Sequence, residues 1–182
     1  MPRNITYRTH ILKNNLTHMP DMQPNLASYS NLPRFPDGRI NYSGSSSAPI
    51  LNCVVKHADH VLLLKRSDKV ANYQGYWNFV AGFIDEPKPV EEKALEEVTE
   101  ELGVSKQNIS FVKAAEPYEV FDQSLNKTWT VYPVLVELKL RPEVKLDWEH
   151  SDCAWILPPE LGRYQTVIKL EETLKRALST KI

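Results

Sequence analysis

One glutamate-rich stretch constrains this chain more than any other, because both of its ends are marked. Pro89 suits the first turn of an α-helix, where a residue without an N–H loses no hydrogen bond, and Gly103 suits the position just past the last turn. Between them, aliphatic residues recur every three or four positions, at Ala94, Leu95, Val98 and Leu102. The sequence therefore predicts a helix over 89–103 with one buried stripe.

The polar side of this predicted helix carries an unusual charge. Six glutamates lie between Glu91 and Glu101, against a single lysine, Lys93. The helix dipole favours Glu92 in the first turn, but it disfavours Glu100 and Glu101 in the last turn by roughly 0.3–1 kcal/mol each. A solvated acidic face is one explanation. The other is a divalent cation, since Mg²⁺ takes carboxylate oxygens and keeps waters and substrate phosphates in its other positions.

The glycines that flank the helix favour the cation. From Gly82 to Val104 the chain resembles the box of the Nudix hydrolase family, G-x5-E-x7-R-E-U-x-E-E-x-G-U, where U is a large aliphatic residue. The glycines and the aliphatic positions coincide in register. So do the three carboxylates that the family places at metal ions, which are Glu97, Glu100 and Glu101 here.

Two positions depart from the family pattern, and their charges are exchanged. The first glutamate of the pattern is Lys88 in this chain, and its arginine is Glu96. In the family these two residues are commonly described as a pair that holds the loop against the helix. A pair between Lys88 and Glu96 would keep the attraction with the signs reversed, so we predict that the exchange is structural and that the site is retained.

The chain from Pro49 onward alternates between strand and helix signals. Apolar runs rich in β-branched residues predict strands, and helical spacing near the end predicts a closing amphipathic helix over 166–179. The predicted strands cover 50–57, 60–67, 76–83, 109–121, 128–140 and 153–157. A mixed sheet between helices is the natural α/β architecture, and the resemblance likewise implies an α/β/α sandwich of Nudix type.

The organisation of the chain divides near residue 48. Residues 1–47 are rich in Pro, Asn and Ser and form a partly irregular N-terminal extension, with a turn at 36–38 and a linker over 43–49. Residues 48–182 form the predicted Nudix hydrolase domain. Three apolar residues of the extension could pack on the domain or on a second subunit of a homodimer, with disorder as the alternative: Ile11, Leu12 and Leu16.

Composition excludes several classes of partner. The net charge of −1 over 182 residues argues against a nucleic-acid surface. The N-terminus lacks the pattern of a signal peptide, and no apolar run is long enough to cross a membrane. Cys53 and Cys153 lie in apolar runs and predict two buried free thiols in a reducing compartment. We therefore expect a cytoplasmic protein.

The resemblance implies hydrolysis of a nucleoside diphosphate linked to another group, with Mg²⁺, or alternatively Mn²⁺, as cofactor. Bound metal lowers the pKa of water from 15.7 to about 7 in favourable cases and so supplies the nucleophile. We predict Glu97 and Glu101 as metal ligands, with Glu100 at a second ion and the main-chain carbonyl of Ala81 completing the shell. Glu100 is the first candidate for the general base and Glu149 is the second.

Substrate recognition is less constrained, beyond the expectation of a small nucleotide diphosphate derivative. Lys65 and Arg66 end a predicted strand and could meet phosphates. Four aromatic residues around the predicted hairpin at 122–127 could stack on a nucleobase, although half or more of them should be core: Tyr118, Phe121, Trp129 and Tyr132. Asp85, in the loop before the helix, is a candidate outer-shell carboxylate. No signature selects the leaving group.

Two other functions share this fold. A Nudix-like ligand sensor keeps the architecture without turnover, and the two departures in the box leave it open. An isopentenyl diphosphate isomerase uses a cysteine in the strand that leads into the box, whereas residues 77–83 contain none. Retention of all three carboxylates favours hydrolysis over the sensor, and the missing cysteine argues against the isomerase.

Overall fold

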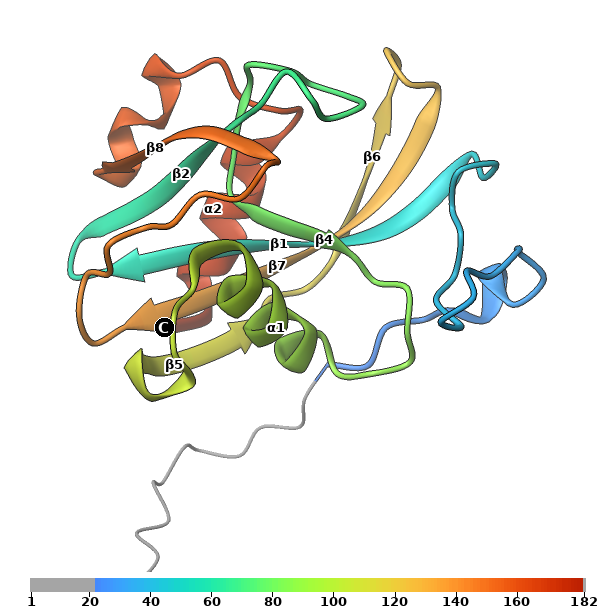
Figure 1. Cartoon of the computed structure of the whole chain (residues 1–182), viewed down its shortest axis with the longest axis horizontal. Helices are drawn as coiled ribbons and strands as arrows, with labels where there is room; N and C mark the ends of the chain where they lie inside the picture. Colours follow the sequence, from blue (N-terminus) through green and yellow to red (C-terminus); the bar gives the residue numbers. More distant parts are fainter. Residues whose placement is uncertain (1–21, 182) are drawn as a thin grey trace, which may run out of the picture.

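The computed structural model of the protein describes residues 22–181. In this range an eight-stranded mixed sheet lies between two α-helices, α1 (Val90–Leu102) on one face and α2 (Leu170–Leu178) on the other (Figure 1). The strands are β1 (Ser47–His57), β2 (His60–Arg66), β3 (Trp77–Asn78), β4 (Val80–Phe83), β5 (Ile109–Ala114), β6 (Tyr118–Asp122), β7 (Lys127–Leu138) and β8 (His150–Ile156). Short 3-10 helices cover Ala27–Tyr29, Lys106–Asn108, Pro158–Arg163 and Ser179–Lys181. The predicted α/β/α sandwich with a mixed sheet is confirmed.

The centre of the sheet is the parallel pair of β1 and β7, whose register runs from Ser47 opposite Thr128 to Lys56 opposite Glu137. β2, β4, β5, β6 and β8 add antiparallel pairings around this pair. β4 pairs with the first half of β1 and then leads through the loop 84–89 into α1. The helix with the glutamates is therefore tied to the middle of the sheet.

Each face of the sheet has its own apolar layer. On one face, α1 buries Val90, Ala94, Val98 and Leu102 against β1 and β7. On the other face, α2 buries Leu170, Leu174 and Ala177 together with Phe79. Three members of the predicted α1 stripe are thus fully buried, whereas Leu95 is only half-buried. This leaves the polar side of α1 facing away from the core.

Several predicted element boundaries are wrong. The strand expected over 109–121 divides into β5 and β6, because Pro117 has no N–H to donate and the pairing with β7 is interrupted between Ala114 and Tyr118. The strand expected over 76–83 divides into β3, which pairs with β2, and β4, which pairs with β1. The closing helix begins only at Leu170, and β1 begins at Ser47, inside the expected linker.

Residues 22–46 pack on the sandwich beside the loop that precedes α1. Gly38 has a φ of 91° in the predicted turn at 36–38, which confirms that turn. Ile40 and Tyr42 are buried against Ala48, and the Tyr42 hydroxyl donates a hydrogen bond of 2.7 Å to the carbonyl of Ile84. The Met22 N–H donates to Glu91 Oε2 at 2.9 Å, so this glutamate has a structural role.

Other predictions meet the structure only in part. The division of the chain at residue 47 stays a prediction, and Ile11, Leu12 and Leu16 lie outside the described residues. Within 22–181, no helix is both long and apolar enough to span a bilayer. Cys53 and Cys153 are free thiols as predicted, but Cys153 is only partly buried.

Candidate active site

A cavity of about 640 Å³ opens beside the polar face of α1. Its walls come from β1, β4, α1, the loop after β2, the β6–β7 hairpin and the loop before β8. All five residues predicted as metal ligands or general base line it: Ala81, Glu97, Glu100, Glu101 and Glu149. The fold therefore brings residues from three separate parts of the chain to one cavity.

The approach of β4 to α1 depends on a glycine. A Cβ atom built on Gly82 would lie 2.3 Å from Glu97 Oε1 and 2.5 Å from Glu97 Cδ, closer than real Cβ contacts. Gly82 is the first residue of the box that resembles the Nudix pattern. It is needed here because the Glu97 carboxylate lies directly against the strand.

Glu101 is a buried acid of the cavity, with 7% of its surface exposed. Its Oε2 atom is buried without a hydrogen-bond partner. Burial, together with the nearby carboxylates of Glu97, Asp147 and Glu149, raises the pKa of Glu101 to about 9, although a hydrogen bond from the Ala81 backbone partly opposes the shift. A buried acid surrounded by other acids lacks a compensating positive charge.

His150 is the nearest cation-forming group to that unpartnered oxygen. Its Nε2 lies 3.8 Å from Glu101 Oε2, and its Nδ1 lies 2.9 Å from Asp147 Oδ1. The sequence analysis missed His150, because nothing in the β8 segment indicates that its register against β2 turns this residue towards α1.

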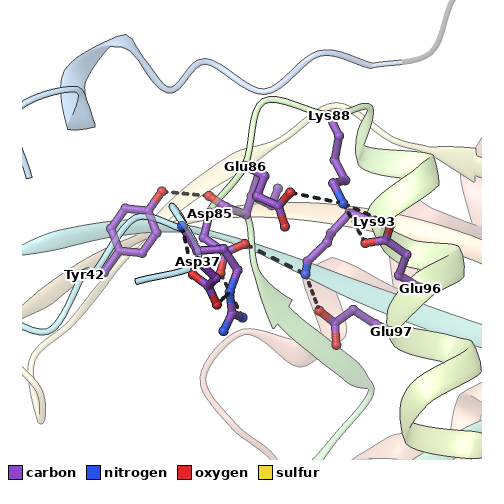
Figure 2. Close-up of polar contacts among 10 residues, drawn as sticks. Asp37, Tyr42, Asp85, Glu86, Lys88, Lys93, Glu96 and Glu97 are labelled. Atoms are coloured by element: carbon purple, nitrogen blue, oxygen red, sulfur yellow. Dashed lines mark hydrogen bonds and ion pairs between the residues drawn. The ribbon is translucent and has the colours of Figure 1, made fainter. Parts of the chain in front are cut away.

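Glu97 is already paired with a lysine. Lys93 Nζ lies 3.0 Å from Glu97 Oε1, one helical turn away, and 3.9 Å from Asp85 Oδ1 (Figure 2). Burial raises the pKa of Glu97 and of Asp85, and Lys93 partly opposes the shift in both. Burial alone would lower the pKa of Lys93, but the carboxylates of Glu97, Asp85 and Glu96 together outweigh it and leave that pKa raised.

The predicted charge exchange is present. Lys88 Nζ lies 3.0 Å from both oxygens of Glu96, and 3.4 Å from Glu86 Oε2 (Figure 2). The Lys88–Glu96 pair joins the loop to α1 on the side away from the cavity, and neither residue lines the cavity. The two departures from the family pattern therefore compensate each other.

The residues present fit a divalent cation. Carboxylate oxygens are the ligands that Mg²⁺ and Mn²⁺ prefer, and the unpartnered oxygen of Glu101 faces a cluster of acids. Among residues 22–181, no three Asp, Glu, His or Cys side chains converge into a preformed cage. The carboxylates of Glu97 and Glu101 are the groups suited to hold an ion. Glu100 is exposed, so its carboxylate is free to contact water.

The predicted substrate residues separate into two groups. Arg66, Tyr118 and Trp129 line the cavity, whereas Lys65 and Phe121 do not. Lys65 lies over the ring of Trp77, and Phe121 is 56% exposed on the hairpin. The Tyr118 hydroxyl donates a hydrogen bond to the carbonyl of Lys169 at the N-cap of α2 and accepts one from the Thr173 hydroxyl in α2.

An aromatic wall that the sequence analysis missed lies next to the box. Phe83 lines the cavity with 45% of its surface exposed. Its ring stacks on Tyr42 with centroids 5.6 Å apart and lies 6.2 Å from Trp129. The position of Phe83 directly after Gly82 was a usable signal, but Tyr42 comes from the N-terminal segment and carries no such signal.

Comparisons with known proteins agree with the box. A family model described as NUDIX domain matches residues 47–177. "Nucleoside triphosphatase NudI" of Escherichia coli is 25% identical over 123 residues, covering 63% of this chain and 84% of that protein. The solved structure of a Nudix hydrolase from M. smegmatis, RenU, has a TM-score of 0.62 at 15% identity, covering 81% of this chain and 92% of that chain.

A second solved structure is a bifunctional NMN adenylyltransferase/ADP ribose pyrophosphatase from Francisella tularensis, complexed with AMP and Mn ion. Its TM-score is 0.59 at 16% identity, and the match covers 74% of this chain and 42% of that chain. These likenesses establish the fold. Because the family model spans most of the chain, the protein belongs to the Nudix family, and it is an enzyme of the Nudix hydrolase class.

Proposed function

We propose that this protein is a metal-dependent pyrophosphohydrolase that cleaves a nucleoside diphosphate linked to another group. The observation that carries the proposal is the unpartnered, buried oxygen of Glu101 in a cavity that also holds Glu97, Glu100 and Glu149. A single buried acid without a partner would only destabilise the fold, whereas four acids around one cavity form a site that suits a cation and a diphosphate bound to it. NudI, named a nucleoside triphosphatase, and the relative with AMP and Mn ion support this class of substrate.

The proposed roles follow from burial. Glu97 and Glu101 are the proposed ligands of Mg²⁺ or Mn²⁺, with the Ala81 carbonyl beside them. The bound ion supplies charge neutralisation at the phosphates and an acidified water. The exposed carboxylate of Glu100 accepts the proton of the attacking water, and Glu149, in the loop before β8, is the second candidate for this base.

The nucleotide is proposed to lie between Arg66 and the aromatic wall. Arg66 is half-buried in the cavity, with its Nε donating to the carbonyl of Asn72 at 3.0 Å, so its guanidinium is held in place for a phosphate. The exposed face of Phe83 beside Trp129 suits an aromatic base, because offset ring stacking stabilises such a contact by about 0.5–1.5 kcal/mol.

Two rival functions differ in what the cavity contains. An isomerase of isopentenyl diphosphate would need a catalytic cysteine, but Cys53 is fully buried and does not line the cavity. A ligand sensor needs the cavity without turnover, so only an assay separates it from a hydrolase. The net charge of −1 supports a small molecule, and not a nucleic acid, as the partner of this protein. The two free thiols support a location in the reducing cytoplasm.

The test is product release from a panel of nucleoside triphosphates, nucleotide sugars, dinucleoside polyphosphates and dinucleotides, with Mg²⁺ or Mn²⁺. Wild type is compared with Glu97→Gln, and with Glu92→Gln as the matched control, since Glu92 is an exposed acid of the same helix. We expect metal-dependent turnover that is lost in Glu97→Gln alone. Binding of nucleotides without turnover of any of them would establish a sensor instead.

A further inference from the structure

Lys93 is a cation placed among the carboxylates of the proposed metal site. It lies on the cavity wall with 11% of its side chain exposed. Its Nζ lies 3.0 Å from Glu97 Oε1 and 3.9 Å from Asp85 Oδ1, and Figure 2 shows the ammonium between these two acids. The helix delivers Glu97 and Lys93 to the same side, because they are four residues apart.

Lys93 also lies near Asp85, an acid that comes from outside α1. Asp85 lies in the loop before α1, is 5% exposed and lines the cavity. Its Oδ2 is 3.5 Å from Arg39 Nη1, whereas its Oδ1 is buried without a hydrogen-bond partner and has Lys93 as its neighbouring cation. One ammonium group therefore faces two acids from separate elements, the buried Asp85 and the partly buried Glu97.

The position of this ammonium competes with a metal ion. A divalent ion on Glu97 Oε1 would have to share that oxygen with Lys93 Nζ, which already lies 3.0 Å from it. Two cations so close on one oxygen repel each other strongly in a partly buried site. While Lys93 holds this oxygen, Glu97 can offer only its other oxygen to an ion shared with Glu101.

We propose that the ammonium group of Lys93 takes the place of one divalent ion in this site. It holds Glu97 towards Asp85 and supplies the positive charge that a second ion would otherwise supply. The site then binds one ion fewer than its carboxylates could otherwise hold. This inference rests on the proposed function, since it assumes that the α1 carboxylates bind metal.

The test is to count Mn²⁺ ions bound per chain without substrate, by calorimetry and by electron paramagnetic resonance of free Mn²⁺. We expect Lys93→Met to bind one more Mn²⁺ than wild type, and Lys93→Arg to keep the wild-type count because it keeps the charge. Lys88→Met is the matched control: it removes an equal charge that pairs with Glu96 outside the cavity, so the count should not change. If Lys93→Met does not fold, Lys93→Gln serves the same comparison with a polar side chain.

An unchanged count in the neutral Lys93 variants would overturn the inference. An unchanged count together with a raised KM would assign Lys93 to a substrate phosphate instead. The inference and the proposed function can fail separately. If Glu97→Gln loses metal-dependent turnover but the neutral Lys93 variants bind as many Mn²⁺ ions as wild type, only the inference is refuted. A gained ion in a protein that hydrolyses nothing refutes only the proposed function.

Discussion

Replacing Gly82 by alanine should damage the active site without unfolding the protein. The added methyl carbon would stand 2.3 Å from Glu97 Oε1, so the carboxylate must retreat by about 1 Å to reach an ordinary contact. A misplacement of about 1 Å at a catalytic group costs on the order of 10²-fold in rate. We therefore expect kcat/KM on the best substrate to fall by about 10²-fold.

The stability of Gly82→Ala should change little. Gly82 does not have a left-handed φ, so alanine fits its backbone, and Glu97 is the far end of a flexible side chain. The loss of unfolded-chain freedom stabilises by about 0.4–1 kcal/mol, which offsets the weakened Lys93–Glu97 pair. Urea denaturation should give a free energy of unfolding within about 1 kcal/mol of wild type.

The matched control is Gly162→Ala, in the 3-10 helix Pro158–Arg163, where an added Cβ meets nothing within 4 Å. This variant should keep wild-type kcat/KM. Wild-type kcat/KM in Gly82→Ala would refute the reasoning, because it would mean that the position of the Glu97 carboxylate is irrelevant to turnover.

Three further predictions concern charge and pH. Lys88→Glu or Glu96→Arg alone should each lower the free energy of unfolding by roughly 0.5–1 kcal/mol, and the double variant should recover it; additive losses would contradict the exchanged pair. Tyr73→Phe removes a 2.5 Å hydrogen bond to the buried Asp122, which should cost about 1.5–3 kcal/mol at pH 7 in urea denaturation. Although burial raises the pKa of Asp122, hydrogen bonds from Ser124 and Tyr73 leave it lowered, so this loss should shrink as the pH falls below about 4, and a pH-independent loss would contradict it. In metal-free protein, the raised pKa of Glu101 means that the folded state binds a proton that the unfolded chain releases, so stability should fall as the pH rises from about 5 to 9. Mn²⁺ should restore the melting temperature more at pH 8 than at pH 6, and Glu101→Gln should abolish both effects.

Elements with strong local signals were predicted well. Helix α1 begins at Val90 after Pro89 and ends before Gly103, whose φ is 65°. These ends depend on the missing N–H of proline and on the left-handed backbone that glycine tolerates. The pairing of Lys88 with Glu96 could also be predicted, because a loop residue and a helix residue of opposite charge lay at positions known to be neighbours.

Elements that depend on partners elsewhere in the chain were predicted less well. The division between β3 and β4 follows from their pairing with different strands, and no periodicity over 76–83 marks it. Lys65 and Phe121 do not line the cavity, because successive side chains of a strand point to opposite faces of the sheet and these two lie on the other face from the cavity. His150 and Tyr42 reach the site or its border only through tertiary packing.

The sequence alone determined the helix, its buried stripe and the register of the three carboxylates, because these depend on residues within one or two turns of each other. The tertiary structure decided which of those carboxylates is buried, paired or exposed. Glu101 is desolvated beside His150, Glu97 is held by Lys93 near Asp85, and Glu100 remains in solvent. Desolvation and charge pairing depend on neighbours in space, and these neighbours come from strands and loops far away along the chain.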